Sequence, residues 1–235
     1  MVAATAMAMV VVVIGWTFGH PIFGLVGGLV AGATLVMLSL VRAVSTLTRS
    51  LKAEPADASR HARALNLADN LCVAGGLVMP RVLVVEASSA NSMVVGVSRR
   101  RCALVLTSGL LETLTRVELE GILARQLSSI RSGDAVLATV ATVLVGRPMG
   151  CLARLVGSRM VVWGDRLVAL IVGSDRDIRI DFSGVALTRY PPGLAAALEK
   201  IAVASRVGRS RPGTSALWCA SPAARTSGET PLLWP

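Results

Sequence analysis

Two uninterrupted apolar runs open the chain. Residues 1–19 (MVAATAMAMVVVVIGWTFG) and residues 22–41 (IFGLVGGLVAGATLVMLSLV) contain no charged side chain. Each run has roughly 20 residues, which as a helix is about 30 Å long and matches the hydrocarbon core of a bilayer. With a Gly-His-Pro turn between them, they predict a transmembrane helical hairpin over residues 1–41. A secretory signal peptide is the less favoured alternative, because no basic segment precedes the first run and a second run follows at once.

Basic residues follow the second apolar run directly. Arg42, Arg49 and Lys52 lie within the next dozen positions, whereas the turn between the runs carries only a histidine. The positive-inside rule therefore places the end of the hairpin and the bulk of the chain in the cytoplasm. Residues 42–57 are interpreted as a juxtamembrane linker. The expected location is the inner (plasma) membrane, with the protein integral to it.

A helix and a small sheet are predicted next. The helix begins at Ala58 and ends at the glycine pair at 75–76. Three short runs rich in β-branched residues follow, beginning at Arg81, Ser92 and Cys102. The arginines at 99–101 form a charged hairpin turn, so we expect the last two strands to be antiparallel.

The helix after the sheet has an unusual buried face. A capping box at Thr115-x-x-Glu118 predicts its start, and Gly133 predicts its end. Its apolar positions recur at helical spacing and form one stripe: Leu119, Ile122, Leu123, Leu127 and Ile130. At 100° per residue Gln126 falls inside this stripe, with Arg125 and Ser129 along its edge. The pattern indicates a helix that turns polar groups toward the interior.

The last third of the chain alternates apolar and polar segments. Residues 135–173 contain apolar runs of only about a dozen residues, which is short for a span; we expect interfacial helices or a second, degenerate hairpin. Further helices are predicted at 174–187, with Ser174 as N-cap, and at 193–207, after two prolines. The tail at 208–235 is rich in Pro, Ser and Gly and is expected to be extended or partly disordered.

Composition and charge agree with a membrane-bound chain. Of the 235 residues 53% are hydrophobic and 16% charged, and the net charge is +10. A bilayer with anionic headgroups is therefore an expected partner. No nucleic-acid partner is expected, because aromatic residues are few and no binding motif is recognisable. Four widely spaced cysteines without a C-x-x-C pair exclude a zinc ribbon and favour buried thiols over disulfides.

Three segments of the sequence occur in an order that is typical of one protein family. Residues 88–96 (SSANSMVVG), 104–134 (LVLTSGLLETLTRVELEGILARQLSSIRSGD) and 180–201 (IDFSGVALTRYPPGLAAALEKI) follow one another in the order of an edge strand, a metal-binding helix and a third-ligand helix. Together they resemble the HtpX-type family of integral-membrane zinc metallopeptidases. The resemblance implies an α+β, mainly helical fold, in which the N-terminal transmembrane hairpin precedes a cytoplasmic zincin-like domain with a small β-sheet. We assign this peptidase-like domain to residues 58–207.

The positions that bind zinc in that family read differently here. The family's His-Glu-x-x-His motif corresponds to Arg125, Gln126 and Ser129, and its third ligand to Asp177. That motif places two imidazoles on one face of the metal and uses the Glu to activate water. A guanidinium cannot ligate zinc, and a neutral amide cannot accept a proton. The resemblance therefore implies a degenerate site with no functional catalytic residue, no metal and no cofactor, the family's zinc being lost.

The chain's histidines offer no substitute for this site. His20 lies in the predicted membrane turn and His61 lies upstream of the sheet. Neither has a partner at ligand spacing, so a relocated zinc site is not expected. The former ligand Asp177 would then need a cation, because a buried carboxylate without a partner is costly. We expect Arg125 to pair with Asp177 or Asp181, and Gln126 and Ser129 to fill the remaining hydrogen bonds.

The function that these observations predict is binding. The chain is interpreted as a catalytically inactive HtpX-like homologue, a pseudopeptidase, that acts as a binding or regulatory subunit for a membrane-protein partner or client. The alternative is an active membrane-bound metalloendopeptidase in membrane-protein quality control with a non-standard site. A decaying paralogue without a selected function is the third possibility. Enzyme activity stays open, although the lost residues argue against it.

Overall fold

The computed structural model describes residues 21–146, 159–173, 175–204 and 217–219. The strands are β1 (Glu54–Pro55), β2 (Arg81–Val85), β3 (Ser92–Ser98) and β4 (Arg101–Thr107). The helices are α2 (Pro21–Val41), α3 (Ala43–Ser50), α4 (Ala62–Gly75), α5 (Ser108–Thr113), α6 (Arg116–Ser132), α7 (Asp134–Ala141), α9 (Arg159–Val172), α10 (Arg176–Thr188) and α11 (Pro191–Ala204), with a π-helical turn, η1, at Thr142–Gly146. The described chain is thus mostly helical.

The four strands form one mixed sheet in the order β1-β2-β4-β3. β3 and β4 pair antiparallel, as the sequence predicts. β2 and β4 pair parallel, with Val82 opposite Leu104. The connection between these two runs through β3, which lies at the outer side of β4 as an edge strand. The edge position of β3 matters below, because it borders the candidate site.

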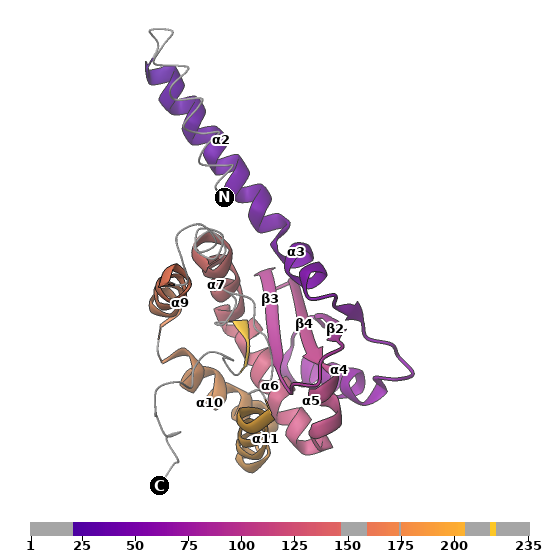
Figure 1. Ribbon diagram of the computed structural model, residues 1–235. Coiled ribbons are helices and arrows are strands. Elements are labelled where there is room, and N and C mark those ends of the chain that lie inside the picture. The colour runs from indigo at the N-terminus through magenta and orange to yellow at the C-terminus, as the bar shows by residue number, and fades with distance from the viewer. Residues whose placement is uncertain (1–20, 147–158, 174, 205–216, 220–235) are drawn as a thin grey trace.

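Helices cover both faces of the sheet (Figure 1). On one face, Leu104 and Leu106 of β4 pack with α4, α6 and α11 in a single buried cluster. On the other face, Ala103 and Val105 pack with residues of α3, α7 and α9 in a second cluster. β4 is therefore buried on both sides, which explains why its sequence is a continuous apolar run and not an alternating one.

α6 begins and ends where its sequence signals predict. Thr115 accepts a hydrogen bond from the Glu118 backbone, and Glu118 accepts one from the Thr115 backbone, which completes the capping box. Gly133 ends the helix with φ 90°, in the left-handed region that favours glycine. Twelve of its residues, from Glu118 to Ile130 with the exception of Glu120, are buried. α6 is thus the central helix of the domain.

Glu118 also anchors α11 to α6. Its Oε2 accepts a hydrogen bond from Lys200 Nζ at 2.8 Å, and this contact is the main reason why the pKa of Glu118 lies below its usual range. A carboxyl whose pKa is lowered by folding stabilises the fold above its ordinary pKa of about 4.5, and that contribution is lost as the pH falls through the folded value. The pair therefore supports the fold at neutral pH and loses this effect in acid.

We expect Glu118→Gln to lower the free energy of unfolding by less than about 1 kcal/mol at pH 7, because Lys200 is partly exposed and glutamine retains the capping bond. The difference from the wild type should shrink toward zero at pH 3. Denaturant unfolding at the two pH values measures it. Glu120→Gln removes a carboxylate from the same helix and is the control; a Glu118 effect that persists at pH 3 would contradict the ion-pair explanation.

Several predicted helix boundaries shift. α4 begins at Ala62 and not at Ala58, and α10 begins at Arg176 with Asp175 in the N-cap position. The expected N-cap, Ser174, lies outside the described residues. α11 begins at Pro191, because a proline in the first helical turn has no intrahelical hydrogen bond to lose. Of the predicted tail only 217–219 is described.

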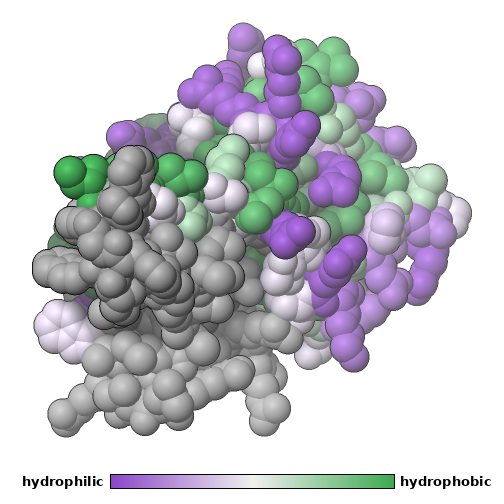
Figure 2. All heavy atoms as spheres, turned by 90° about the horizontal axis from the view of Figure 1, so that it is seen from above, coloured by the Kyte–Doolittle hydropathy of each residue, from purple (hydrophilic) through white to green (hydrophobic). Residues whose placement is uncertain are grey.

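α2 protrudes from the domain (Figure 1) and carries much of the exposed apolar surface. Its large exposed hydrophobic residues are Ile22, Val26, Leu29, Val30, Met37, Leu38 and Val41. Seen from the side to which α2 points, hydrophobic atoms form a band with hydrophilic atoms along one side (Figure 2). This surface is larger than scattered single residues would make, so it indicates a contact with another apolar phase or molecule.

The structure describes the second apolar run of the predicted hairpin. The first run of the hairpin lies outside the described residues, and the second corresponds to α2. Within the described ranges no single helix meets the combined length and hydropathy criteria for a span. Two bent pairs do meet them together: Val26–Val41 with Val44–Ser50, and Arg116–Ser132 with Asp134–Val145.

Candidate functional site

α10 crosses α6 at very short range, at the residues that the family resemblance singles out. A Cβ atom added to Gly184 would lie 2.9 Å from both the backbone N and the Cα of Arg125. No side chain larger than hydrogen fits there without separating the two helices. Gly184 therefore sets how closely the acids of α10 approach the polar residues of α6.

Arg125 lies at this crossing and forms two ion pairs with α10. Its side chain is only 7% exposed. Nη2 donates a hydrogen bond to Asp177 Oδ1 at 3.1 Å, and Nε donates one to Asp181 Oδ1. The two acids are four residues apart, so they share one face of α10. The predicted pairing of Arg125 with Asp177 or Asp181 is confirmed, and it extends to both.

Neighbouring charges and burial have opposite effects on the pKa of Arg125. Burial alone would lower the pKa of Arg125, but its charged neighbours, Asp181 and Asp177 among them, outweigh burial and raise it. Arg125 is therefore a permanent cation. Asp177 and Asp181 keep 69% and 33% of their side-chain surface exposed, so water shares in solvating the acids but hardly reaches the guanidinium. The buried cation depends on its carboxylates more than they depend on it.

Gln126 and Ser129 do not join the ion pair, so this part of the prediction is wrong. Gln126 Nε2 donates to Ser92 Oγ at 2.8 Å, across to β3. Ser129 Oγ donates to the backbone oxygen of Gln126, in its own helix, at 2.7 Å. Gln126 lies about 100° around the helix from Arg125, so it faces the sheet when Arg125 faces α10. The buried polar side chains of α6 therefore contact two different neighbours: Gln126 contacts the sheet and Arg125 contacts α10.

One residue of this site was not predicted from the sequence. Cys219, from the C-terminal tail, lies beside Arg125, with its Sγ 3.4 Å from Nη1. Its backbone N–H donates to the oxygen of Ser92 at 2.8 Å, and Trp218 forms an antiparallel bridge with Met93. No local pattern could have indicated the contact with Arg125, because it joins residues 94 positions apart in the sequence.

The remaining candidate ligands do not converge. Among the described residues, no group of three or more His, Cys, Asp and Glu side chains could hold a metal ion. His61 Nδ1 accepts a hydrogen bond from the backbone of Asp57, and His20 lies outside the described residues. At the α6–α10 crossing, the guanidinium of Arg125 lies between the two acids. A metal ligand must have a lone pair to donate, and a guanidinium has none.

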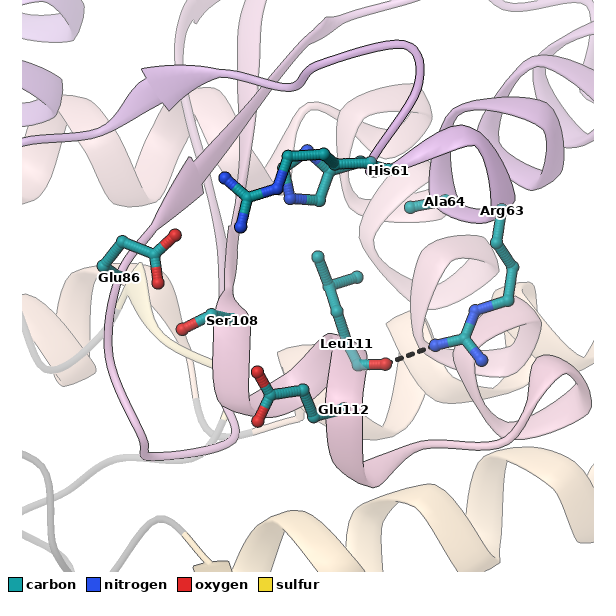
Figure 3. A pocket seen from close by; sticks show the side chains of 8 residues that line it. His61, Arg63, Ala64, Glu86, Ser108, Leu111 and Glu112 are labelled. Atoms are coloured by element: carbon teal, nitrogen blue, oxygen red, sulfur yellow. Dashed lines mark hydrogen bonds between the residues drawn. The ribbon is translucent and has the colours of Figure 1, made fainter.

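A separate pocket of about 290 Å³ lies between α4 and α5 (Figure 3). Its lining is Arg60, His61, Arg63, Ala64, Glu86, Ser108, Leu111 and Glu112. Arg63 reaches across it to donate a hydrogen bond to the Leu111 carbonyl. The lining thus carries both basic and acidic side chains, and none of them belongs to the Arg125 cluster. The pocket and the candidate site are therefore distinct.

Comparison with known proteins identifies the family. The chain is 32% identical over 166 residues to a protein named Protease HtpX homolog from Dictyoglomus turgidum (strain DSM 6724 / Z-1310), with 59% of this chain and 53% of that protein covered. It is 30% identical over 216 residues to one of the same name from Listeria monocytogenes serotype 4b (strain CLIP80459), with 76% and 70% covered. The chain belongs to the HtpX protease family.

Further relatives cover a similar part of the chain. The Protease HtpX homolog of Tropheryma whipplei (strain Twist) is 30% identical over 189 residues, which are 69% of this HtpX-family chain and 64% of the relative. The chain thus spans about half the length of the Dictyoglomus protein and up to 70% of the others. No protein-family profile and no solved structure matches it.

Proposed function

We propose that this HtpX-family chain is a pseudopeptidase, which has lost zinc chemistry and acts by binding a membrane-protein partner or client. The observation that carries this proposal is the buried guanidinium of Arg125 between Asp177 and Asp181. By the family resemblance, Arg125 corresponds to a zinc-ligating histidine of the family, within a domain that we assign to the zincin-like class. A structural ion pair there replaces a metal that would otherwise neutralise the acids.

The residues present do not fit zinc. Arg125 has no lone pair to donate and adds a positive charge next to any incoming cation. Ser129 directs its hydroxyl hydrogen to its own helix, and Gln126, which stands in the position of the general base, donates its amide hydrogen to Ser92. Asp177 is the one family-position ligand with suitable chemistry, and Arg125 already pairs with it. A zinc site needs three protein ligands, so one carboxylate is insufficient.

We expect the purified full-length chain to contain far less than one equivalent of zinc by elemental analysis and to leave an unfolded membrane-protein substrate uncleaved when zinc is added. Arg125→His should not restore either property, because it leaves the acids without their cation and supplies only one imidazole. Arg179→His, on the exposed side of α10, is the matched control. Stoichiometric zinc with cleavage by the wild type would contradict the proposal and support the active-peptidase alternative. A stoichiometric partner from native membranes, without either, would support the binding role.

We also propose that the chain is integral to the membrane, with its domain on the cytoplasmic side. The apolar surface of α2 and the basic residues that follow it support this orientation. A reporter that works only in the cytoplasm should therefore be active when it is fused after Lys52. A phosphatase reporter that works only outside the cytoplasm should be inactive at the same place. The reverse pattern would contradict the orientation.

A further inference from the structure

The pocket between α4 and α5 lies at the carboxyl end of the parallel strand pair. β2 and β4 pair so that Val85 is opposite Thr107, and Glu86 and Ser108 follow these two residues directly. Both of the following residues line the pocket. In sheets with parallel strands, ligands bind preferentially in the crevice outside the carboxyl ends of the strands. The pocket therefore occupies a place in the fold where a ligand site is expected.

The turn before α4 is held in one conformation by its own hydrogen bonds. Asp57 Oδ1 accepts from the backbone N–H of Ser59 at 2.6 Å and from that of Arg60 at 3.2 Å. His61 Nδ1 accepts from the backbone N–H of Asp57 at 3.1 Å. A neutral imidazole with an accepting Nδ1 carries its hydrogen on Nε2, which can then donate. Arg60 and His61 thus line the pocket from a fixed turn.

The segment that carries Glu86 is fastened to the start of α5. Ser108 Oγ donates to the Ala87 carbonyl at 3.1 Å and accepts from the Ala87 N–H at 3.0 Å. Arg63 donates to the Leu111 carbonyl, which ties α4 to α5 (Figure 3). The frame of the pocket is therefore cross-linked by hydrogen bonds before any ligand arrives. A preformed frame lowers the conformational cost of binding.

The charged groups of the pocket do not contribute to this frame through ion pairs. Arg60 comes from the α4 side of the pocket, and Glu86 and Glu112 come from the β2 and α5 side. All three are exposed, and none of them takes part in the ion pairs among the described residues. With Arg63, the lining carries two guanidinium groups and two carboxylates. A ligand with one charge would meet repulsive and attractive groups alike, whereas a ligand with both charges can match each of them.

We propose that this pocket binds a small zwitterion. Its anionic group binds Arg60 and the Nε2–H of His61. Its ammonium group binds Glu86 and Glu112, and the apolar stem between the two charges packs against Leu111. A volume of about 290 Å³ lies at the lower limit of small-molecule sites, so the ligand has the size of an amino acid. Because the charged groups stay in contact with water, we expect a dissociation constant on the order of millimolar.

Three isosteric probes test the charge requirement on the full-length chain in detergent. 6-Aminohexanoate carries both charges, 6-acetamidohexanoate keeps only the carboxylate, and 6-aminohexanamide keeps only the ammonium group. Saturation-transfer NMR, with the signal of empty micelles subtracted, measures the three dissociation constants. We expect 6-aminohexanoate to bind at millimolar concentrations and each of the other two to bind at least about fivefold more weakly, because each has lost one charged contact.

Two substitutions should reverse the preference in opposite directions. Arg60→Met should weaken 6-aminohexanoate about fivefold and tighten 6-aminohexanamide about twofold, because it removes a cation from the lining. Glu112→Gln should weaken 6-aminohexanoate by a similar factor and tighten 6-acetamidohexanoate. A mere loss of structure would weaken all three probes together. Arg100→Met and Glu120→Gln remove the same charges outside the pocket and are the matched controls, which should leave all three constants unchanged.

Three results would overturn the proposal. One is the absence of saturation transfer to 6-aminohexanoate at about 20 mM, well above the expected dissociation constant. Another is equal binding of the three probes, which would show that charge is not recognised. The third is an unchanged order of affinities in both Arg60→Met and Glu112→Gln, which would place the binding elsewhere on the chain. None of these readouts depends on zinc, on cleavage or on the Arg125 cluster, so they stand apart from the test of the pseudopeptidase proposal.

Discussion

Gly184→Ala is expected to lower the free energy of unfolding by about 2–3 kcal/mol, although alanine normally favours a helix over glycine. The added Cβ would lie 2.9 Å from two backbone atoms of Arg125, and backbone atoms cannot rotate away as a flexible side chain can. α10 would have to move away from α6, which would also lengthen the contacts from Arg125 to both acids. Denaturant unfolding of the purified protein measures the change.

Gly75→Ala is the matched control for this substitution. It places the same methyl group at the end of α4, where the nearest atoms are leucine side-chain atoms at 3.5 Å or more. It should be neutral or slightly stabilising. If Gly184→Ala proved as stable as the wild type, α10 could not cross α6 as closely as the structure has it, and the geometry of the ion-pair cluster would be wrong as well.

Asp181→Asn is expected to cost about 3 kcal/mol, because it leaves the guanidinium of Arg125 buried with a mostly exposed partner, Asp177. Arg125→Met should cost less, about 1 kcal/mol, since methionine replaces the buried stem, Asp177 is 69% exposed and Asp181 keeps 33% of its surface exposed. The test is that Asp181→Asn destabilises the protein more than Arg125→Met does. This order follows from the unequal exposure of the three side chains.

The double variant Arg125→Met with Asp181→Asn tests this explanation. It should be close in stability to Arg125→Met alone, because no charge is then left buried, and the cycle should give a coupling energy of about 3 kcal/mol in magnitude. Arg179→Met removes a guanidinium from an exposed pair with Asp134 on the same helix and should change stability by no more than about 0.5 kcal/mol. A coupling energy near zero would mean that the cluster contributes no more than a surface pair.

Local signals in the sequence predicted the elements around the site. The capping box at Thr115 and the glycine at 133 bound α6 correctly, because a helix end is decided by groups within one turn of it. The β-branched runs predicted β2, β3 and β4 for a similar reason, since their side chains fit a pleated, buried surface. Arg125 was recognised as a possible partner of Asp177 and Asp181 only through the family resemblance, because no local rule relates α6 to α10.

What the sequence by itself determined is therefore the existence of most elements, the limits of α6, the family, and the residue types at the positions that the family resemblance singles out. The tertiary structure alone decided that β2 runs parallel to β4, that Gln126 faces Ser92 and not the ion pair, and that Cys219 lies on β3. Each of these depends on which distant surfaces pack together. Packing depends on all the buried side chains together, whereas a helix cap or a periodic apolar stripe depends on a few residues that are close in the sequence.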